Sequence, residues 1–167
     1  MSFIYMLCFL LIHYQHSVYS LHLNRSNLAR MCKCNIYGTF ISLLDKNLTS
    51  VDPETFRGLT RIERLRLEGN HLESVDANLY EGLTNLIWVD LDRNKLAYID
   101  PSMFRHLKNL EVIDMYDNKL TYLNETIFQG LPKLKSIWLQ NNSFNRLSSN
   151  LFRLVFLFTK IRVKTLY

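Results

Sequence analysis

A period of 24 residues runs through most of this 167-residue chain and limits the folds that it can adopt. An asparagine marks each period, with apolar side chains eight, five and three residues before it and two and five residues after it. The marker residues are Asn70, Asn94, Asn118 and Asn142. Self-similarity at one fixed period in the range of about 20 to 29 residues is typical of solenoids, in which each coil buries its apolar face against the next.

The residues around each asparagine predict a short strand followed by an inward turn. Apolar residues five and three before the asparagine alternate with polar neighbours, as in a strand with one buried face. The asparagine amide can then satisfy backbone groups of adjoining coils that would otherwise be buried without partners, which predicts a structural asparagine ladder. Ten residues after each ladder position comes an aromatic ring, and these rings predict a core opposite the strands. The rings are Phe56, Tyr80, Phe104, Phe128 and Phe152.

With these residues the chain resembles the extracellular leucine-rich repeat proteins of the 24-residue class, over residues 38 to 152. The resemblance implies an α/β fold, namely a leucine-rich repeat solenoid of about five coils with a concave parallel β-sheet. It also implies an irregular or short-helical convex side, and a concave sheet that binds other proteins. Family members commonly carry cysteine caps at both ends. Here the N-terminal cysteine cap is degenerate and the C-terminal one is absent.

We divide the chain into four segments. They are a signal peptide at 1–20, an N-terminal cap remnant at 21–37, five repeats at 38–154 and a basic apolar tail at 155–167. The apolar run of residues 3–12 is too short to span a bilayer, and it indicates a cleaved secretory signal, with a buried strand or an uncleaved anchor as alternatives. No later stretch is apolar for long enough to anchor the mature chain. We therefore predict a secreted, extracellular protein.

The cap remnant contains Cys32 and Cys34, and Leu43 stands where the family places a fourth cysteine. Residues separated by one position in an extended segment point apart, so these two thiols are poorly placed to bond each other. We expect two free or mispaired thiols, or a disulfide to another chain. A zinc site that uses His22 lacks the second pair of ligands, so we predict no metal.

Positive charge is concentrated at the two ends of the chain. The formal net charge is +5, and leaving out the seven basic residues of the ends gives −2 for residues 36–150. The basic tail suits a matrix or glycan contact, or an anionic lipid. The alternatives are a short strand that covers the last coil, or a truncated gene model. We favour these alternatives, because four charges without interleaved aromatic residues are a weak polyanion signal.

Four Asn-x-Ser/Thr triplets are candidate glycosylation sites in a secreted protein. They are Asn24, Asn47, Asn124 and Asn141. Asn47 and Asn141 lie beside the predicted ladder and Asn124 begins a convex connection, so all three are expected to face solvent. Glycans there would make those edges unavailable to a partner.

Side chains six, four and two residues before each ladder position are expected to point outward from the sheet. Because parallel strands lie about 4.8 Å apart, Arg66 can pair with Asp90, and Arg64 can lie over Trp88. An acidic centre flanked by aromatic rings favours a basic protein partner, although a solvated strand face is the alternative. The predicted partner-binding residues are Arg64, Arg66, Trp88, Asp90, Asp92, Asp114, Tyr116 and Trp138.

The sequence contains no signature of catalysis. Nucleophile-elbow, phosphate-loop and zinc-protease motifs are absent. An open sheet offers neither a water-excluding cleft for an Asp90–Asp114 pair nor an encircling loop for calcium. We predict a non-catalytic module without a cofactor that binds a protein ligand and no nucleic acid. Two alternatives are a truncated ectodomain of a cell-surface leucine-rich repeat receptor and a structural component of the extracellular matrix.

Overall fold

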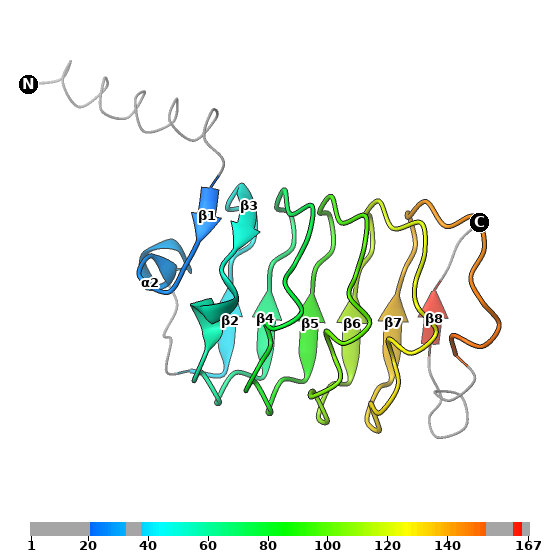
Figure 1. Ribbon diagram of the computed structural model, residues 1–167. Coiled ribbons are helices and arrows are strands. Elements are labelled where there is room, and N and C mark those ends of the chain that lie inside the picture. Colours follow the sequence, from blue (N-terminus) through cyan, green and yellow to red (C-terminus); the bar gives the residue numbers. More distant parts are fainter. Residues whose placement is uncertain (1–20, 33–37, 153–161, 165–167) are drawn as a thin grey trace, which may run out of the picture.

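The computed structural model describes residues 21–32, 38–152 and 162–164 and shows a solenoid of stacked coils (Figure 1). Six parallel strands, one after another, form the main sheet. They are β2 (Phe40–Ser42), β4 (Arg64–Arg66), β5 (Trp88–Asp90), β6 (Val112–Asp114), β7 (Ser136–Trp138) and β8 (Arg162–Lys164). The predicted solenoid with a parallel sheet is confirmed. The predicted signal peptide, Cys34 and residues 155–161 and 165–167 of the tail lie outside the described residues.

The strands pair in the register that the 24-residue period predicts. Leu65 is the partner of Val89, and Val89 is the partner of Ile113. These central residues are buried while their neighbours in the strand face outward, because side chains alternate between the two faces of a strand. At the far end, Val163 of β8 pairs with Ile137 of β7. The tail therefore contributes a strand against the last coil, as expected for a cover.

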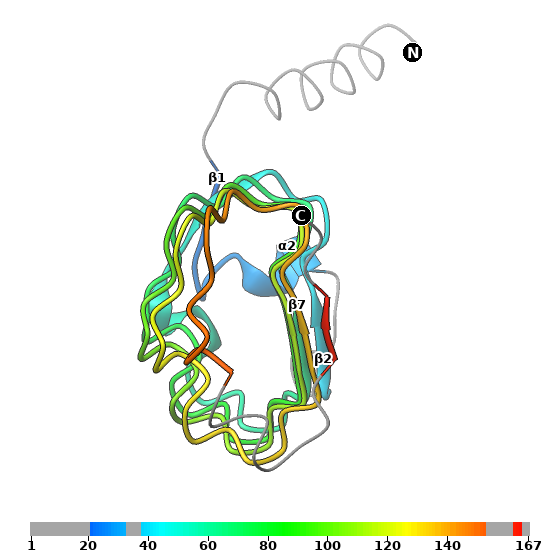
Figure 2. The same ribbon diagram turned by 90° about the vertical axis from the view of Figure 1, so that its right-hand side faces the viewer.

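Residues 21–32 pack on the other end of the stack. Strand β1 (Leu21–Leu23) pairs with β3 (Leu48–Val51) in a separate two-stranded sheet. Helix α2 (Leu28–Cys32) follows, and Leu23 and Leu28 are fully buried. Figure 1 places α2 at the end of the stack beside β1 and β2, and in the view along the stack α2 lies within the outline of the coils (Figure 2). This segment therefore covers apolar surface that the first coil would otherwise expose.

One expectation for this end is wrong. Cys32 is disulfide-bonded, with its partner outside the described residues, so it is not a free thiol. The expectation assumed an extended segment, whereas Cys32 is the last residue of helix α2, where successive side chains follow a different direction.

The predicted asparagine ladder is confirmed. The Asn94 amide oxygen accepts a hydrogen bond from the Leu72 N–H at 3.1 Å, and its Nδ2 donates to the carbonyl oxygens of Leu67 and Leu91 at 3.0 and 3.1 Å. The same pattern links each ladder residue to the coil before it, at Asn70, Asn118 and Asn142. Each amide thus satisfies backbone groups in two coils, and neighbouring coils are joined by side chains as well as by the sheet.

The residue before each ladder position has a left-handed backbone, a feature that the sequence analysis does not identify. The positive φ angles are 52° at Asp45, 67° at Gly69, 49° at Arg93, 51° at Asp117 and 56° at Asn141. Gly, Asn and Asp tolerate this conformation best. At Gly69 space is also limiting, because a Cβ there would lie 1.9 Å from Asp45 Oδ1.

The side of the coil opposite the sheet is built from turns. Asp52 accepts a hydrogen bond from the Glu54 N–H at 2.8 Å and caps the 3-10 helix η1 (Pro53–Phe56). Side chains bonded in this way to the backbone two residues on favour turns. Equivalent bonds begin the turns of the other coils, where the accepting side-chain oxygens belong to Asp76, Asp100, Asn124 and Ser148. The described convex side is thus irregular with a short helical piece, as predicted.

The ring column forms the predicted core behind these turns. The rings of Tyr80 and Phe104 stack with their centroids 6.1 Å apart, and those of Phe128 and Phe152 at 6.2 Å. Phe56, Tyr80, Phe104 and Phe128 are buried, and Phe152 is partly buried against the same core. The core therefore runs the length of the stack and holds the sheet rigidly in place.

Candidate functional site

Outward-facing side chains on and just after strands β4 to β7 form a surface that we call the sheet face. It consists of Arg64, Arg66, Glu68, Trp88, Asp90, Asp92, Asp114, Tyr116 and Trp138. The Arg64 guanidinium lies 5.6 Å from the centre of the Trp88 ring, within the range of a cation–π contact. Arg66 Nε lies 3.7 Å from Asp90 Oδ2. Both contacts that the register predicts are therefore confirmed.

Four carboxylates lie together at the centre of the sheet face, and we call them the carboxylate cluster. They are Glu68, Asp90, Asp92 and Asp114. Asp90 and Asp114 are register partners on β5 and β6. Glu68 and Asp92 occupy equivalent positions in consecutive coils. The N–H of Gly69, the residue after Glu68, donates to the Asp92 carbonyl oxygen at 3.0 Å. Sequence reasoning places the three aspartates in this centre but omits Glu68 from the binding residues.

The carboxylate cluster is more buried than an outward position on an open sheet suggests. The exposed fractions are 1% for Glu68, 6% for Asp90 and 5% for Asp114. Both aspartates fold back over the ends of their strands. Asp114 Oδ1 accepts from the Tyr116 N–H at 3.0 Å, and Asp90 Oδ1 accepts from the Asp92 N–H at 3.4 Å. These bonds hold the carboxylates in place before any ligand arrives.

The cluster has more negative charge than its neighbouring cations neutralise. Glu68 pairs with Arg66, but its Oε2 is buried without a hydrogen-bond partner. Asp92 pairs with the exposed Arg93, whose Nε lies 3.5 Å from Asp92 Oδ2. Asp114 has no ion pair within the described part of the chain. The uncompensated charge is therefore greatest around Asp114.

This arrangement raises the pKa values of the carboxylates. Burial raises the pKa of Asp90 to about 7, and the three neighbouring carboxylates add to the rise. Burial also raises the pKa of Asp114 to about 6, although a backbone hydrogen bond opposes it, and raises the pKa of Glu68 above its usual value. At 3.7 Å the Arg66 contact to Asp90 is too long to offset these effects. The cluster therefore keeps protons near neutral pH.

Aromatic side chains flank the carboxylate cluster. Trp88 begins β5 and Trp138 ends β7, and both are partly buried, whereas Tyr116 is 39% exposed. The Trp88 Nε1 atom is buried without a hydrogen-bond partner. Rings that combine a large apolar area with an unused polar atom are common at the centres of protein interfaces.

A second pair of exposed rings lies off the sheet face. Tyr98 and Tyr122 are each 55% exposed and hold equivalent positions in consecutive coils, four residues after a ladder asparagine. Sequence reasoning did not identify them, although the 24-residue spacing that relates them is visible in the sequence. They provide a natural comparison for any test of the sheet face.

The four candidate glycosylation residues lie outside strands β4 to β7. Asn47 and Asn141 are exposed, and Asn24 and Asn124 are partly buried. The side-chain oxygens of the latter two accept backbone hydrogen bonds that begin α2 and a convex turn. Glycans at these four positions would leave the strands of the sheet face uncovered, and their attachment stays a prediction.

Other features of the described residues do not add a chemical centre to the sheet face. A hollow of about 190 Å³ lies beside the strands. It is lined by Glu63, Asn85, Ile87, Asn109, Glu111 and Lys133. Within residues 21–32, 38–152 and 162–164, no group of three or more acidic, histidine or cysteine side chains is arranged to hold a metal ion. No helix in the same residues is long and apolar enough to cross a membrane.

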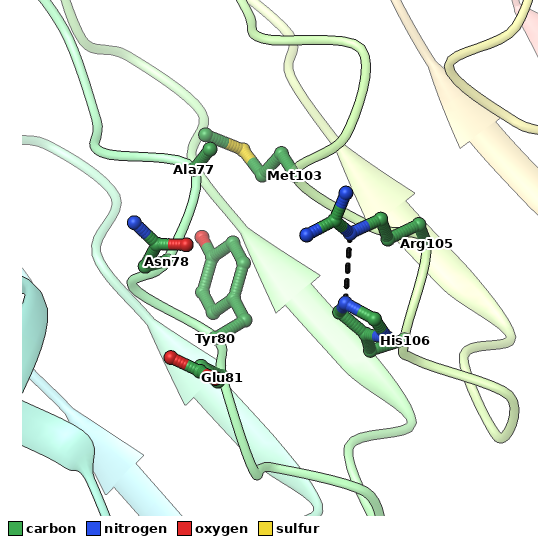
Figure 3. A pocket seen from close by; sticks show the side chains of 7 residues that line it. All are labelled: Ala77, Asn78, Tyr80, Glu81, Met103, Arg105 and His106. Atoms are coloured by element: carbon green, nitrogen blue, oxygen red, sulfur yellow. Dashed lines mark hydrogen bonds between the residues drawn. The ribbon is translucent and has the colours of Figure 1, made fainter.

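A cavity of about 20 Å³ lies beside Tyr80 on the convex side (Figure 3). The Tyr80 hydroxyl is buried and has no hydrogen-bond partner, and burial together with the charge of Asp90 raises its pKa. At the rim of the cavity, Arg105 Nε donates to His106 Nε2 at 2.7 Å. The ring column contains phenylalanine in its other four coils, so a hydroxyl at this position is not required for packing of the ring.

Replacing Tyr80 with phenylalanine should raise the free energy of unfolding by about 1 kcal/mol, because an unpaired buried hydroxyl is costly. Chemical denaturation of the two proteins measures the difference. The reverse change in the same column, Phe104→Tyr, should destabilise the fold. A decrease in stability for Tyr80→Phe would show that the hydroxyl is bonded, for instance to a water molecule in the cavity.

Comparison with known proteins identifies the family to which this architecture belongs. Residues 39–96 and 84–144 match the family model of the leucine rich repeat. The chain is a leucine-rich repeat protein. The matched ranges include strands β4 to β7, and hence the whole sheet face, so the proposed surface belongs to the repeats themselves. No curated protein matches this leucine-rich repeat protein in sequence.

The solved structures that are similar to the leucine-rich repeat protein include the following two. One is Toll in the Toll–Spatzle complex of Drosophila, with 28% sequence identity and a TM-score of 0.68, covering 73% of this chain and 16% of that one. The other is the TLR13–ssRNA13 complex, with 25% identity and a TM-score of 0.72, covering 87% of this chain and 20% of that one. The chain therefore spans a fifth or less of either neighbour's length.

Proposed function

We propose that this leucine-rich repeat protein is a non-catalytic binding module that recognises a basic protein partner through its sheet face. The observation that carries the proposal is the carboxylate cluster, fixed on a rigid sheet and flanked by Trp88, Tyr116 and Trp138. A surface that is ordered before binding loses little conformational freedom on association, so more of its contact energy becomes affinity.

The charge of the sheet face favours a basic partner. An acidic patch attracts a basic surface and accelerates encounter, whereas it repels the phosphates of a nucleic acid. The two similar structures contain different ligands, because Toll is in complex with Spatzle and TLR13 with ssRNA13. The net charge of −2 over residues 36–150 supports a protein ligand for this chain over RNA.

An extracellular location is part of the proposal. It is supported by the signal-like segment 1–20, by the four glycosylation triplets and by the likeness to Toll and TLR13. Mass spectrometry of the protein from the culture medium tests both the cleavage of the signal-like segment and the glycosylation. The expected result is a mature chain that begins near residue 21 and carries glycans, and an intact N-terminus without glycans would contradict it.

A second candidate is that the module acts as part of a longer cell-surface receptor. It is favoured by the length of the similar chains, of which this one covers 16% and 20%. Sequencing of the transcript across the codon for Phe152 distinguishes the two, because further repeats in a continuing reading frame would favour the receptor.

A matrix role through the basic tail predicts salt-sensitive retention on heparin that is lost without residues 155–167.

Removing the aromatic flanks of the sheet face should weaken partner capture at least about tenfold, because large rings dominate interface energies. The test variant is Trp88→Ala with Trp138→Ala, and capture is measured by pull-down with the purified chain as bait. The matched control is Tyr98→Ala with Tyr122→Ala, which removes two exposed rings outside the sheet face. Circular dichroism checks the fold of both. Capture that survives in the test variant, or fails equally in the control, would move the binding site elsewhere.

A further inference from the structure

One row across the sheet face, which continues beyond Trp138 to its register partner Lys164 on β8, has no cation directly beside Asp114. Arg66, Asp90, Asp114 and Trp138 are successive register partners on β4 to β7. Arg66 lies beside Asp90 and pairs with it, but the next position after Asp114 carries an indole. The row therefore leaves Asp114 without a positive neighbour in the sheet, between a second carboxylate and an aromatic ring.

We propose that the space between Asp92 and Asp114 is a binding site for one basic side chain of the protein ligand. Its guanidinium or ammonium group enters this space and displaces protons from the carboxylate cluster. The inference rests on the proposed function and names the group that the sheet face recognises. The exposed Tyr116, two residues after Asp114, suits a cation, because aromatic faces attract positive charge.

A second member of the carboxylate cluster also has an unsatisfied oxygen. Glu68 is 1% exposed, and its Oε2 has no hydrogen-bond partner among the described residues. A buried carboxylate oxygen without a donor is costly and is usually satisfied by a partner. The described residues hold no group with the arrangement of a metal site, so the directed donors of an arginine or lysine side chain fit better than a metal ion.

The titratable and charged groups around the site come from every packed element. They are Arg66 and Glu68 from the coil of β4, Asp90, Asp92 and Arg93 from that of β5, Asp114 and Tyr116 from that of β6, the Tyr80 hydroxyl from the core, and Lys164 on β8 as the register partner of Trp138. Because the pKa of Asp90 is about 7 and that of Asp114 about 6, a cation that binds the ionised carboxylates must release protons. Affinity for a cation should therefore rise with pH between about 5 and 8.

The test uses the full chain and a pair of small probes, the peptides Gly-Arg-Gly and Gly-citrulline-Gly. Citrulline has nearly the shape of arginine but no charge. Binding is followed by NMR of the aspartate and glutamate carboxyl carbons at pH 5 and pH 8. The expected result is that the arginine peptide binds at least about tenfold more tightly at pH 8 than at pH 5, with the largest shifts at Asp114 and Asp92, while the citrulline peptide does not bind.

A matched pair of variants separates this site from general charge attraction. Asp114→Asn should remove most of the arginine-peptide binding, whereas Glu73→Gln removes one exposed carboxylate elsewhere and should leave it unchanged. Equal binding of the citrulline peptide, pH-independent binding, or equal losses in the two variants would overturn the proposal. Partner capture that still depends on Trp88 and Trp138 would in that case leave the proposed function standing.

Discussion

Replacing Asn94 with alanine is expected to lower the free energy of unfolding by about 4 kcal/mol. The change leaves the Leu72 N–H and the carbonyl oxygens of Leu67 and Leu91 buried without their partners. An unsatisfied buried backbone group costs about 1–3 kcal/mol, and the coils cannot separate locally to admit water without losing sheet pairing. Urea denaturation followed by circular dichroism measures the loss.

The matched control is Asn85→Ala. Asn85 is exposed, and its amide makes one hydrogen bond, to the Thr60 carbonyl at 2.9 Å. This variant should lose less than about 1 kcal/mol. Similar losses for Asn85→Ala and Asn94→Ala would contradict the ladder as a main source of stability, because the two changes remove the same side chain.

Acidification from pH 8 to pH 5 is expected to stabilise the folded protein by about 4 kcal/mol. The pKa of Asp90 is raised to about 7 in the folded state from an ordinary value of 3.8, and that of Asp114 to about 6. The folded state therefore binds more protons than the unfolded chain between about pH 4 and pH 7, so stability falls as pH rises through that window. Thermal unfolding at a series of pH values measures this slope.

The double variant Asp90→Asn with Asp114→Asn isolates the carboxylate cluster. It should be more stable than the natural chain at pH 8 and nearly independent of pH between 5 and 8. A natural chain whose stability rises with pH over this range, or a double variant that keeps the original slope, would show that the two carboxylates ionise normally.

The repeat spacing is sufficient to predict the fold and the neighbours on its sheet. A fixed 24-residue shift determines which residues are adjacent on successive strands, and the pairs Arg66–Asp90 and Arg64–Trp88 follow from it directly. The ladder is predictable for the same reason, because its bonds join residues at constant separations.

Burial and protonation are not predictable from that spacing. An outward position leaves open how far a short carboxylate folds back onto the backbone. The N–H groups of Asp92 and Tyr116, which donate to Asp90 and Asp114, decide it. Glu68 is 1% exposed although its position in the repeat is an outward one, and the left-handed residue before each ladder position is a property of backbone geometry. The disulfide at Cys32 is likewise not predictable from the repeat spacing, because Cys32 lies outside the repeats.

The most direct test of the sheet face as the binding surface is site-specific photocrosslinking. A photoreactive phenylalanine analogue replaces Tyr116 on the sheet face in one protein and Tyr122 outside it in another; the two side chains are 39% and 55% exposed. Captured partner is then irradiated and analysed by mass spectrometry. We expect crosslinks to the partner from position 116 and none from position 122. Crosslinks from position 122 alone would contradict binding through the sheet face.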